Sequence, residues 1–343
     1  MRAAPEPSWM KQMRLPLAGG LVPFYATAIR LKNAAYDVGG WKRRRLRFPV
    51  VSVGNLSVGG TGKTPFTILL AEMLQTCGWK VDVLSRGYGR SSRQVARVEP
   101  DGRAEMFGDE PLMMARRGIA VYVGADRFQA GLLAESDAGG SAGSTPRAVH
   151  LLDDGFQHRR LARTVDIVLV RRADLADEML PLGRLREPLS ALQRADICVL
   201  RAEDADLASR VLGLMHRADP ASVWIVERRM TVPTPPPLNA LAFCAIGDPR
   251  GFFEGLRGAG LNIVKQIYFR DHHAYAQRDI LKLKFSARQS GANGFVTTEK
   301  DNVRLGPLLR AELETEFPLL TIGLETKLRE AAEAMAMLES LLS

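Results

Sequence analysis

The stretch Val50–Pro65 reads VVSVGNLSVGGTGKTP, in which a β-branched run passes into a glycine-rich turn and then into Lys-Thr and an apolar segment. Glycines allow successive backbone N–H groups to converge on an anion, and the N-terminus of a following helix adds its dipole. Lys63 supplies a point charge for the β- and γ-phosphates, and the Thr64 hydroxyl can bind Mg²⁺. The stretch therefore predicts a phosphate-binding P-loop made of Gly59, Gly60, Thr61, Gly62, Lys63 and Thr64.

The match to the usual P-loop pattern has one departure. Ser57 stands where the first glycine is usual, although Gly59 and Gly60 supply compensating freedom. A glycine-rich turn with an incidental Lys-Thr is the alternative, and it requires strand, turn and helix signals to coincide by chance. We therefore interpret the stretch as a nucleoside triphosphate site.

A second element supports this interpretation. The apolar run 148–152 predicts a strand, and it ends in the paired carboxylates Asp153 and Asp154. A Walker B strand ends in this way, with its Asp holding Mg²⁺. Two Asp residues before Gly155 could instead form a solvated turn. Behind a P-loop, we favour a metal site that combines Thr64 with Asp153 and Asp154.

Composition narrows the class of partner. The length of 343 residues indicates two domains, and 46% hydrophobic residues allow ordinary cores. Three well-separated cysteines and five histidines form no zinc-site spacing. The net charge of +9 predicts an anionic partner. Because only 7% of residues are aromatic and no RNA-binding signature appears, we expect lipid or a phosphorylated substrate and no nucleic acid.

The N-terminus, residues 1–47, favours lipid. The run Leu15–Ile29 carries no charge, is flanked by cations, and precedes the basic cluster Lys42–Arg47. It is shorter than the roughly 20 residues that a spanning helix needs, and it contains Gly19, Gly20 and Pro23. We therefore expect an amphipathic segment in the interface of an anionic membrane. A signal peptide and a helix packed on the protein's own core are the alternatives.

Strand and helix signals alternate after residue 48, which is typical of a parallel sheet covered by helices. Strands are expected at residues 80–85, near 121, and at 148–152, 165–170, 197–200, 223–226, 241–246, 263–269 and 295–298. The polar segment Glu135–Arg147 is expected to be a surface loop, and Lys327–Leu342 a closing amphipathic helix. The proline run Pro233–Pro237 suggests a boundary between domains. We expect a P-loop domain at 48–230, a linker at 231–237 and a smaller α/β domain at 238–343.

Two clusters remain open at the level of sequence. Asp109 and Glu110 precede a helix, where one could accept a hydroxyl proton or Asp109 could simply cap that helix. His272 follows Asp271 at a strand end, where it could reach across a cleft or cap a turn. Arginines that phosphoryl transfer could use lie in several predicted loops, at Arg86, Arg90, Arg127, Arg184 and Arg186.

Two common P-loop classes fit poorly. The base-reading motif N-K-x-D of GTPases is missing, because the nearest string, TEKD at 298–301, has the wrong order. Partitioning ATPases carry a lysine at the position that Val58 occupies.

The full motif series resembles that of the tetraacyldisaccharide 4'-kinase family, the lipid A 4'-kinases. The matching strings are GNLSVGGTGKTP at 54–65, SRGYG at 85–89, GDEP at 108–111, GADR at 124–127, DDGFQH at 153–158, LREP at 185–188, DH at 271–272 and TTEKD at 297–301. They occur in family order, and together they are far more specific than a P-loop alone.

The resemblance implies an ATP- and Mg²⁺-dependent kinase at the cytoplasmic face of a Gram-negative inner membrane. It would phosphorylate the 4'-hydroxyl of the lipid A disaccharide 1-phosphate precursor to give lipid IV-A. Asp109 corresponds to the catalytic base and His272 to its partner, beside Lys63 of the P-loop. Further positions at or near the active site are Arg86, Glu110, Arg127, His158, Arg186 and Glu187. The alternative is a membrane-recruited P-loop ATPase switch or metallochaperone, which would need no base at Asp109.

Overall fold

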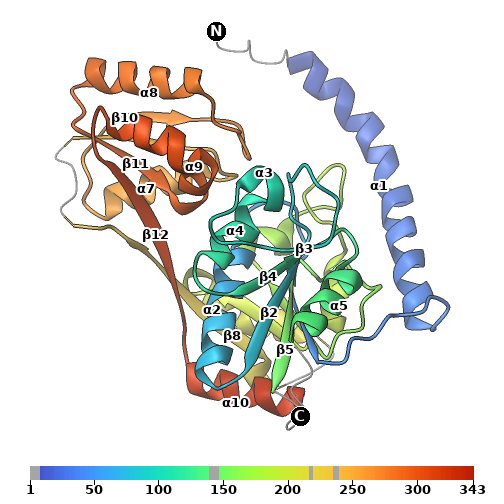
Figure 1. Ribbon diagram of the computed structural model, residues 1–343. Coiled ribbons are helices and arrows are strands. Elements are labelled where there is room, and N and C mark those ends of the chain that lie inside the picture. Colours follow the sequence, from blue (N-terminus) through green and yellow to red (C-terminus); the bar gives the residue numbers. More distant parts are fainter. Residues whose placement is uncertain (1–7, 139–146, 216–218, 235–238) are drawn as a thin grey trace.

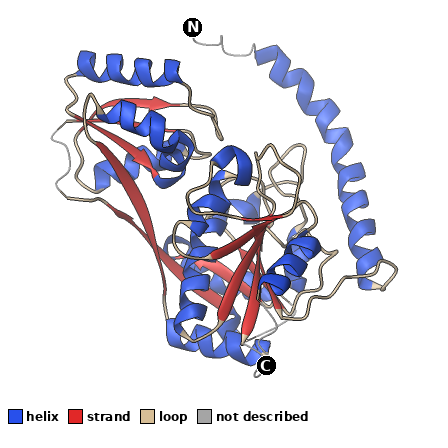
Figure 2. Cartoon of the chain, viewed as in Figure 1, coloured by secondary structure: helices blue, strands red, loops and turns tan. Residues whose placement is uncertain are grey.

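The computed structural model describes residues 8–138, 147–215, 219–234 and 239–343. The chain forms two lobes joined by extended strands, with a long helix, α1 (Ser8–Asp37), beside the larger lobe (Figure 1). All twelve strands of the described residues form one continuous sheet in the order β10-β9-β11-β12-β8-β7-β6-β1-β5-β2-β4-β3. Helices pack on both faces of this sheet (Figure 2).

The larger lobe has an almost wholly parallel sheet. Its strands are β1 (Val50–Asn55), β2 (Lys80–Ser85), β3 (Ala96–Arg97), β4 (Ala120–Val123), β5 (Ala148–Asp153), β6 (Val165–Leu169), β7 (Ile197–Arg201) and β8 (Val223–Thr231). Among these eight strands, the short β3 alone runs antiparallel to its neighbour, β4. Because β1 lies between β5 and β6, the loops after β1 and β5 meet at one edge of the sheet, where α/β proteins bind ligands.

Apolar side chains alternate across this sheet and bury its two faces. Helices α2 (Lys63–Thr76), α4 (Asp109–Ala115) and α10 (Ala331–Leu342) share one core with Val51, Val53 and Leu151. Helices α5 (Arg127–Asp137) and α6 (Ala208–Leu214) cover the other face, in cores that contain Leu152 and Val168. The short α3 (Ala104–Phe107) precedes α4. The expected P-loop α/β/α main domain is confirmed.

The smaller lobe is a second three-layer unit. Strands β9 (Ala240–Cys244), β10 (Ile263–Tyr268) and β11 (Gly294–Thr298) are parallel to one another and to the start of β12 (Leu319–Leu328). Helix α7 (Pro249–Gly258) packs on one face, while α8 (Gln277–Ser290) and α9 (Glu299–Glu314) pack on the other. The expected second α/β unit is confirmed.

The C-terminal part differs from the sequence-based expectation. Lys327 lies in β12, not in a helix, and the closing helix α10 begins at Ala331. Residues 319–322 of β12 pair with β11, and residues 323–328 pair antiparallel with β8. Strand β12 therefore crosses from the smaller lobe to the larger one, where α10 packs. Pairing with a partner about a hundred positions away leaves no local signal, which is why the strand was missed.

Two further segments can be compared with the loop and the linker that the sequence predicts. The segment Glu135–Arg147 is not a loop throughout, because α5 continues to Asp137. Glu135 accepts hydrogen bonds from the backbone N–H groups of Arg47 and Phe48, which holds this helix end in place. Residues 139–146, and Pro235–Pro237 of the expected linker, lie outside the described residues.

Helix α1 runs without interruption through Gly19, Gly20 and Pro23. Its C-terminal half is tied to the larger lobe: Asn33 donates to Glu187 at 2.7 Å, and Arg159 pairs with Asp37. Large apolar side chains of α1 remain exposed, at Leu21, Phe24 and Leu31. Within the described residues, no helix is long and apolar enough to cross a bilayer.

Candidate active site

The glycine-rich turn after β1 has P-loop geometry. Gly59 and Gly62 have φ angles of 103° and 91°, in the left-handed region that favours glycine. Gly62 is the residue before α2, so the helix begins directly at Lys63. The hydroxyl groups of Thr61 and Thr64 belong to buried side chains at this helix end. The predicted phosphate-binding residues thus form a single turn against a helix N-terminus.

Charged groups fill the space beside this turn. Lys63 Nζ donates to Asn55 Oδ1 at 3.1 Å and lies 3.5 Å from Asp154 Oδ1. Arg186 donates to both carboxylate oxygens of Asp154, at 3.1 and 2.9 Å, and also to Asn55. Burial alone would raise the pKa of Asp154, but Lys63 and Arg186 hold it at about 2. Asp154 is therefore an ionised carboxylate that forms ion pairs with both Lys63 and Arg186.

Asp153 has the opposite environment. It is buried, its Oδ2 accepts from Ser85 at 3.2 Å, and its Oδ1 has no hydrogen-bond partner within the described residues. Burial, followed by the charges of Glu110 and Asp154, raises its pKa to about 7. A buried carboxylate oxygen without a partner lacks a compensating cation.

This arrangement fits Mg²⁺. Mg²⁺ is usually held by one or two carboxylates, a hydroxyl, water and substrate phosphates, and not by a complete set of protein ligands. The described residues contain no cluster of three or more Asp, Glu, His or Cys that could hold a metal by itself. Asp153, with Thr64 and Asp154 as the other candidate ligands, has the chemistry that such an ion requires.

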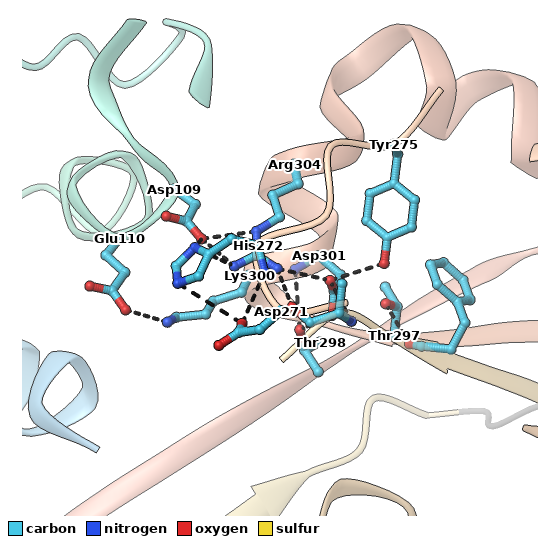
Figure 3. Close-up of polar contacts among 12 residues, drawn as sticks. Asp109, Glu110, Asp271, His272, Tyr275, Thr297, Thr298, Lys300, Asp301 and Arg304 are labelled. Atoms are coloured by element: carbon cyan, nitrogen blue, oxygen red, sulfur yellow. Dashed lines mark hydrogen bonds and ion pairs between the residues drawn. The ribbon is translucent and has the colours of Figure 1, made fainter. Parts of the chain in front are cut away.

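A second group forms between the lobes (Figure 3). Asp109 begins α4 in the larger lobe, and His272 follows β10 in the smaller lobe, with 3.3 Å between Oδ2 and Nδ1. Arg304 of α9 donates to the same Oδ2 from Nε at 2.9 Å. Burial alone would raise the pKa of Asp109, but His272, Arg304 and Lys300 together hold it well below its usual value. The carboxylate is therefore ionised.

The residues beside the P-loop and the cluster between the lobes each include one strained backbone position. Asp154 and His272 have φ angles of 49° and 58°, which side chains other than glycine rarely adopt. Such conformations cost free energy and persist where the surroundings impose them, often at functional sites. The Tyr88 ring packs against the His272 ring, with 5.1 Å between centroids, and helps to hold it.

The remaining predicted residues take different places. Glu110 pairs with Lys300 across the lobes, and its charge acts on Asp153, so it lies between the two groups. Arg127 is buried, and burial followed by the charge of the exposed Arg86 lowers its pKa. Burial, with Arg127 and Arg163, lowers the pKa of His158 to about 4, so this histidine is neutral. Glu187 contacts Asn33 of α1 and Arg194, which makes it a link to the N-terminal helix.

Sequence reasoning missed several residues of the site. Asn55 accepts from both Lys63 and Arg186, and it could have been noticed as the last residue of the strand before the P-loop. Arg304 lies one helical turn after Lys300, so their helical spacing was a signal. Arg228 donates to the carbonyl of Thr61 at 2.9 Å, and nothing local in the sequence indicates this contact.

Comparison with known proteins identifies the family. A model of the family described as tetraacyldisaccharide-1-P 4'-kinase matches residues 17–343. The chain belongs to this family. A tetraacyldisaccharide 4'-kinase of Koribacter versatilis is 46% identical over 325 residues, covering 92% of this chain and 95% of that protein. A tetraacyldisaccharide 4'-kinase of Geobacter metallireducens is 39% identical over 300 residues, covering 83% of this chain and 87% of that protein.

A solved structure agrees. The family member LpxK from Aquifex aeolicus, whose crystal structure is described as a complex with ATP, superposes with a TM-score of 0.74 at 30% identity. The match covers 95% of this chain and 100% of that one. The resemblance to the lipid A 4'-kinases is therefore confirmed, and with it the expectation of an ATP-dependent lipid kinase.

Proposed function

We propose that this tetraacyldisaccharide 4'-kinase carries out phosphoryl transfer at the junction of its lobes, with the P-loop holding ATP and Asp109 serving as the base. The reaction moves the γ-phosphoryl group of ATP to the 4'-hydroxyl of tetraacyldisaccharide 1-phosphate, giving lipid IV-A in lipid A biosynthesis. The observation that carries the assignment of the base is the 3.3 Å contact between Asp109 and His272. It places a carboxylate from one lobe against a histidine from the other.

The P-loop residues bind and orient the nucleotide. Backbone N–H groups at the start of α2 face the phosphates, and Lys63 exchanges its contacts with Asn55 and Asp154 for the β- and γ-phosphate oxygens. Arg186, which contacts the same two partners, is placed to neutralise charge on the transferred group.

Asp109 acts on the acceptor. As the new oxygen–phosphorus bond forms, the 4'-hydroxyl loses its proton to the Asp109 carboxylate, and the bond to the β–γ bridging oxygen breaks to release ADP. His272 orients the carboxylate and stabilises its ionised form. Because Asp109 is already ionised, no prior loss of a proton is needed.

Mg²⁺ fits the carboxylate side of the P-loop. Thr64, Asp153 and Asp154 would hold the ion, which when bound supplies positive charge to the phosphate oxygens. The ion would supply Asp153 with the cation that its unpartnered Oδ1 lacks.

The substrate's acyl chains require access to a bilayer. The exposed apolar residues of α1, Leu21, Phe24 and Leu31, and the basic cluster Lys42–Arg47 supply the two signals that stable attachment to an anionic surface needs. Because ATP is a cytoplasmic substrate, we assign the protein to the cytoplasmic face of the inner membrane as a peripheral protein.

The test is a transfer assay with γ-labelled ATP and the disaccharide lipid. Asp109→Asn should lower kcat by about 10² to 10⁴-fold, because a general base is worth that much, with little change in KM for ATP. Lys63→Ala serves as a comparison that also weakens nucleotide binding. Full transfer activity of folded Asp109→Asn would refute the base assignment. ATP hydrolysis without labelled lipid in the wild-type protein would instead favour the ATPase switch.

A further inference from the structure

Arg304 contacts both members of the Asp109–His272 pair (Figure 3). Its Nε donates to Asp109 Oδ2 at 2.9 Å, and its Nη2 donates to the same oxygen. Nη2 also lies 3.2 Å from Nδ1 of His272. The Arg304 side chain is only 6% exposed. One guanidinium group thus lies between the carboxylate and the imidazole.

The chemistry of these atoms makes Arg304 the donor in each contact. A guanidinium group can only donate hydrogen bonds, whereas the Asp109 carboxylate can only accept them when it is ionised. Oδ2 of Asp109 and Nδ1 of His272 lie 3.3 Å apart, and Nη2 of Arg304 lies within hydrogen-bond distance of both atoms. Arg304 therefore helps to hold the carboxylate and the imidazole in their relative positions.

Arg304 is fixed to the smaller lobe. Its Nη1 donates to the carbonyl of Ala245 and lies 3.4 Å from Asp301 Oδ1. Asp301 is fully buried and accepts from the Tyr275 hydroxyl at 3.0 Å and from the backbone N–H of Ala245 at 3.0 Å. The backbone N–H of His272 donates to the same Ala245 carbonyl at 3.3 Å. The smaller lobe therefore presents Arg304 and His272 to Asp109 as one assembly.

The lobes are also joined without Arg304. Lys300, one turn earlier on α9, pairs with Glu110. Arg117 of the larger lobe pairs with Glu299, at the start of α9, at 2.7 Å. Two other ion pairs thus join the lobes, whereas Arg304 is the residue of α9 whose N–H groups donate to the Asp109 carboxylate.

We propose that Arg304 is a positioning residue for phosphoryl transfer: it fixes Oδ2 of Asp109 against His272 and leaves Oδ1 to accept the hydroxyl proton. This role rests on the proposed function of Asp109 as the base. The charged and titratable groups around Asp109 are Arg304 and Lys300 of α9, His272 of the loop after β10, and its neighbour Glu110. Asp271 and Asp301 act on it through Arg304.

The experiment compares Arg304→Met with Arg304→Lys in the full chain, with transfer kinetics measured across pH. Arg304→Met should lower kcat about 10²-fold, because the base is no longer aligned, and should leave KM for ATP near wild type. The acid limb of kcat/KM should move to higher pH by about one to three units, since a neighbouring cation depresses a carboxyl pKa by that amount. Arg304→Lys keeps the positive charge but loses the paired N–H groups of the guanidinium. Its acid limb should therefore stay near that of the wild type, and its kcat should lie between those of Arg304→Met and the wild type.

Arg310→Met is the matched control. Arg310 lies on the part of α9 that follows the kink at Gly306, in an exposed pair with Glu314 at 3.2 Å. Its loss should change neither kcat nor the pH profile. If Arg304→Met alone does not fold, the double variant Asp109→Asn/Arg304→Met avoids an unpaired buried charge. That double variant should be no slower than Asp109→Asn alone, because Arg304 acts through Asp109.

The outcomes separate the two proposals. An inactive Asp109→Asn, together with Arg304→Met at wild-type kcat and an unmoved acid limb, would overturn the positioning role alone. Losses that multiply in the double variant would overturn it as well. An active Asp109→Asn would overturn the role of Asp109 itself. A shifted limb with rescue by Lys supports the proposal.

Discussion

Gly62 allows a sharp test of the P-loop geometry. Its φ angle is 91°, and a Cβ at this position would lie 1.3 Å from Nη2 of Arg228. Arg228 donates to the Thr61 carbonyl from the same nitrogen, and burial followed by the charge of Arg201 lowers its pKa to about 10. Arg228 is half-buried, so its guanidinium end can move aside, but doing so breaks the hydrogen bond to Thr61. Gly62→Ala must therefore strain the backbone and displace Arg228.

The expected cost has two parts. A left-handed conformation costs an alanine about 1–2 kcal/mol. Displacing Arg228 breaks a hydrogen bond from a charged donor, which costs about 1.5–3 kcal/mol. The sum is about 2.5–5 kcal/mol, so the unfolding midpoint Tm of a chain of this length should fall by about 3–7 °C. Thermal unfolding without nucleotide measures this effect independently of ATP binding.

Gly60→Ala is the matched control. Gly60 lies in the same turn, but its φ angle is not positive, and a Cβ there would meet no atom within 4 Å. A compatible Gly→Ala change is neutral or stabilising by about 0.4–1 kcal/mol. In an Arg228→Met background, Gly62→Ala should cost only the backbone share. Equal Tm values for Gly62→Ala and Gly60→Ala would refute the packing of Arg228 against the turn.

Two further predictions address the metal site and the membrane. Because the pKa of Asp153 is raised from 3.8 to about 7, the free energy of unfolding falls as the pH rises through this range and stays low above it. Asp153→Asn should therefore raise Tm more at about pH 8 than at about pH 5, as measured by differential scanning fluorimetry. The same variant should lose Mg²⁺-dependent turnover. Equal gains in Tm at both pH values would contradict the raised pKa. Truncation after Ile29 keeps the contacts of Asn33 and Asp37 with the larger lobe. The truncated protein should sediment less with anionic vesicles and should have a higher KM for the lipid but not for ATP. Phe24→Ser should act in the same direction, because each large apolar side chain contributes about 1.5–3 kcal/mol to insertion. Unchanged vesicle binding would mean that α1 only packs against the larger lobe.

The parts of the site that are contiguous in sequence were predictable. The P-loop turn is encoded by adjacent glycines, Lys63 and Thr64, and its geometry follows from the residues themselves. Asp153 ends β5, which pairs in parallel with β1, as expected from the apolar run before it, because parallel strands end at one edge of a sheet. Periodicity also predicted both α/β units. These signals are local or repeat regularly along the chain.

Contacts between distant segments left no such signal. Strand β12 alternates poorly because its two halves lie in different lobes, so Lys327 was assigned to a helix. Arg304 and Asp109 are 195 positions apart, and nothing near either residue indicates the other. The motif string at 297–301 was recognised, but its chemistry was unassigned until the structure placed Lys300 against Glu110.

The division of the site between the lobes has a consequence for catalysis. The larger lobe alone supplies the P-loop, Asp153, Asp154 and Arg186, so it contains everything proposed to hold the nucleotide. The base also belongs to that lobe, but both groups that orient it, His272 and Arg304, come from the smaller one. Movement along the β8–β12 connection would therefore change the alignment of the base without changing the phosphate-binding turn. We therefore expect nucleotide binding and readiness for transfer to be separable, and ATP hydrolysis to be slow when no acceptor is in place.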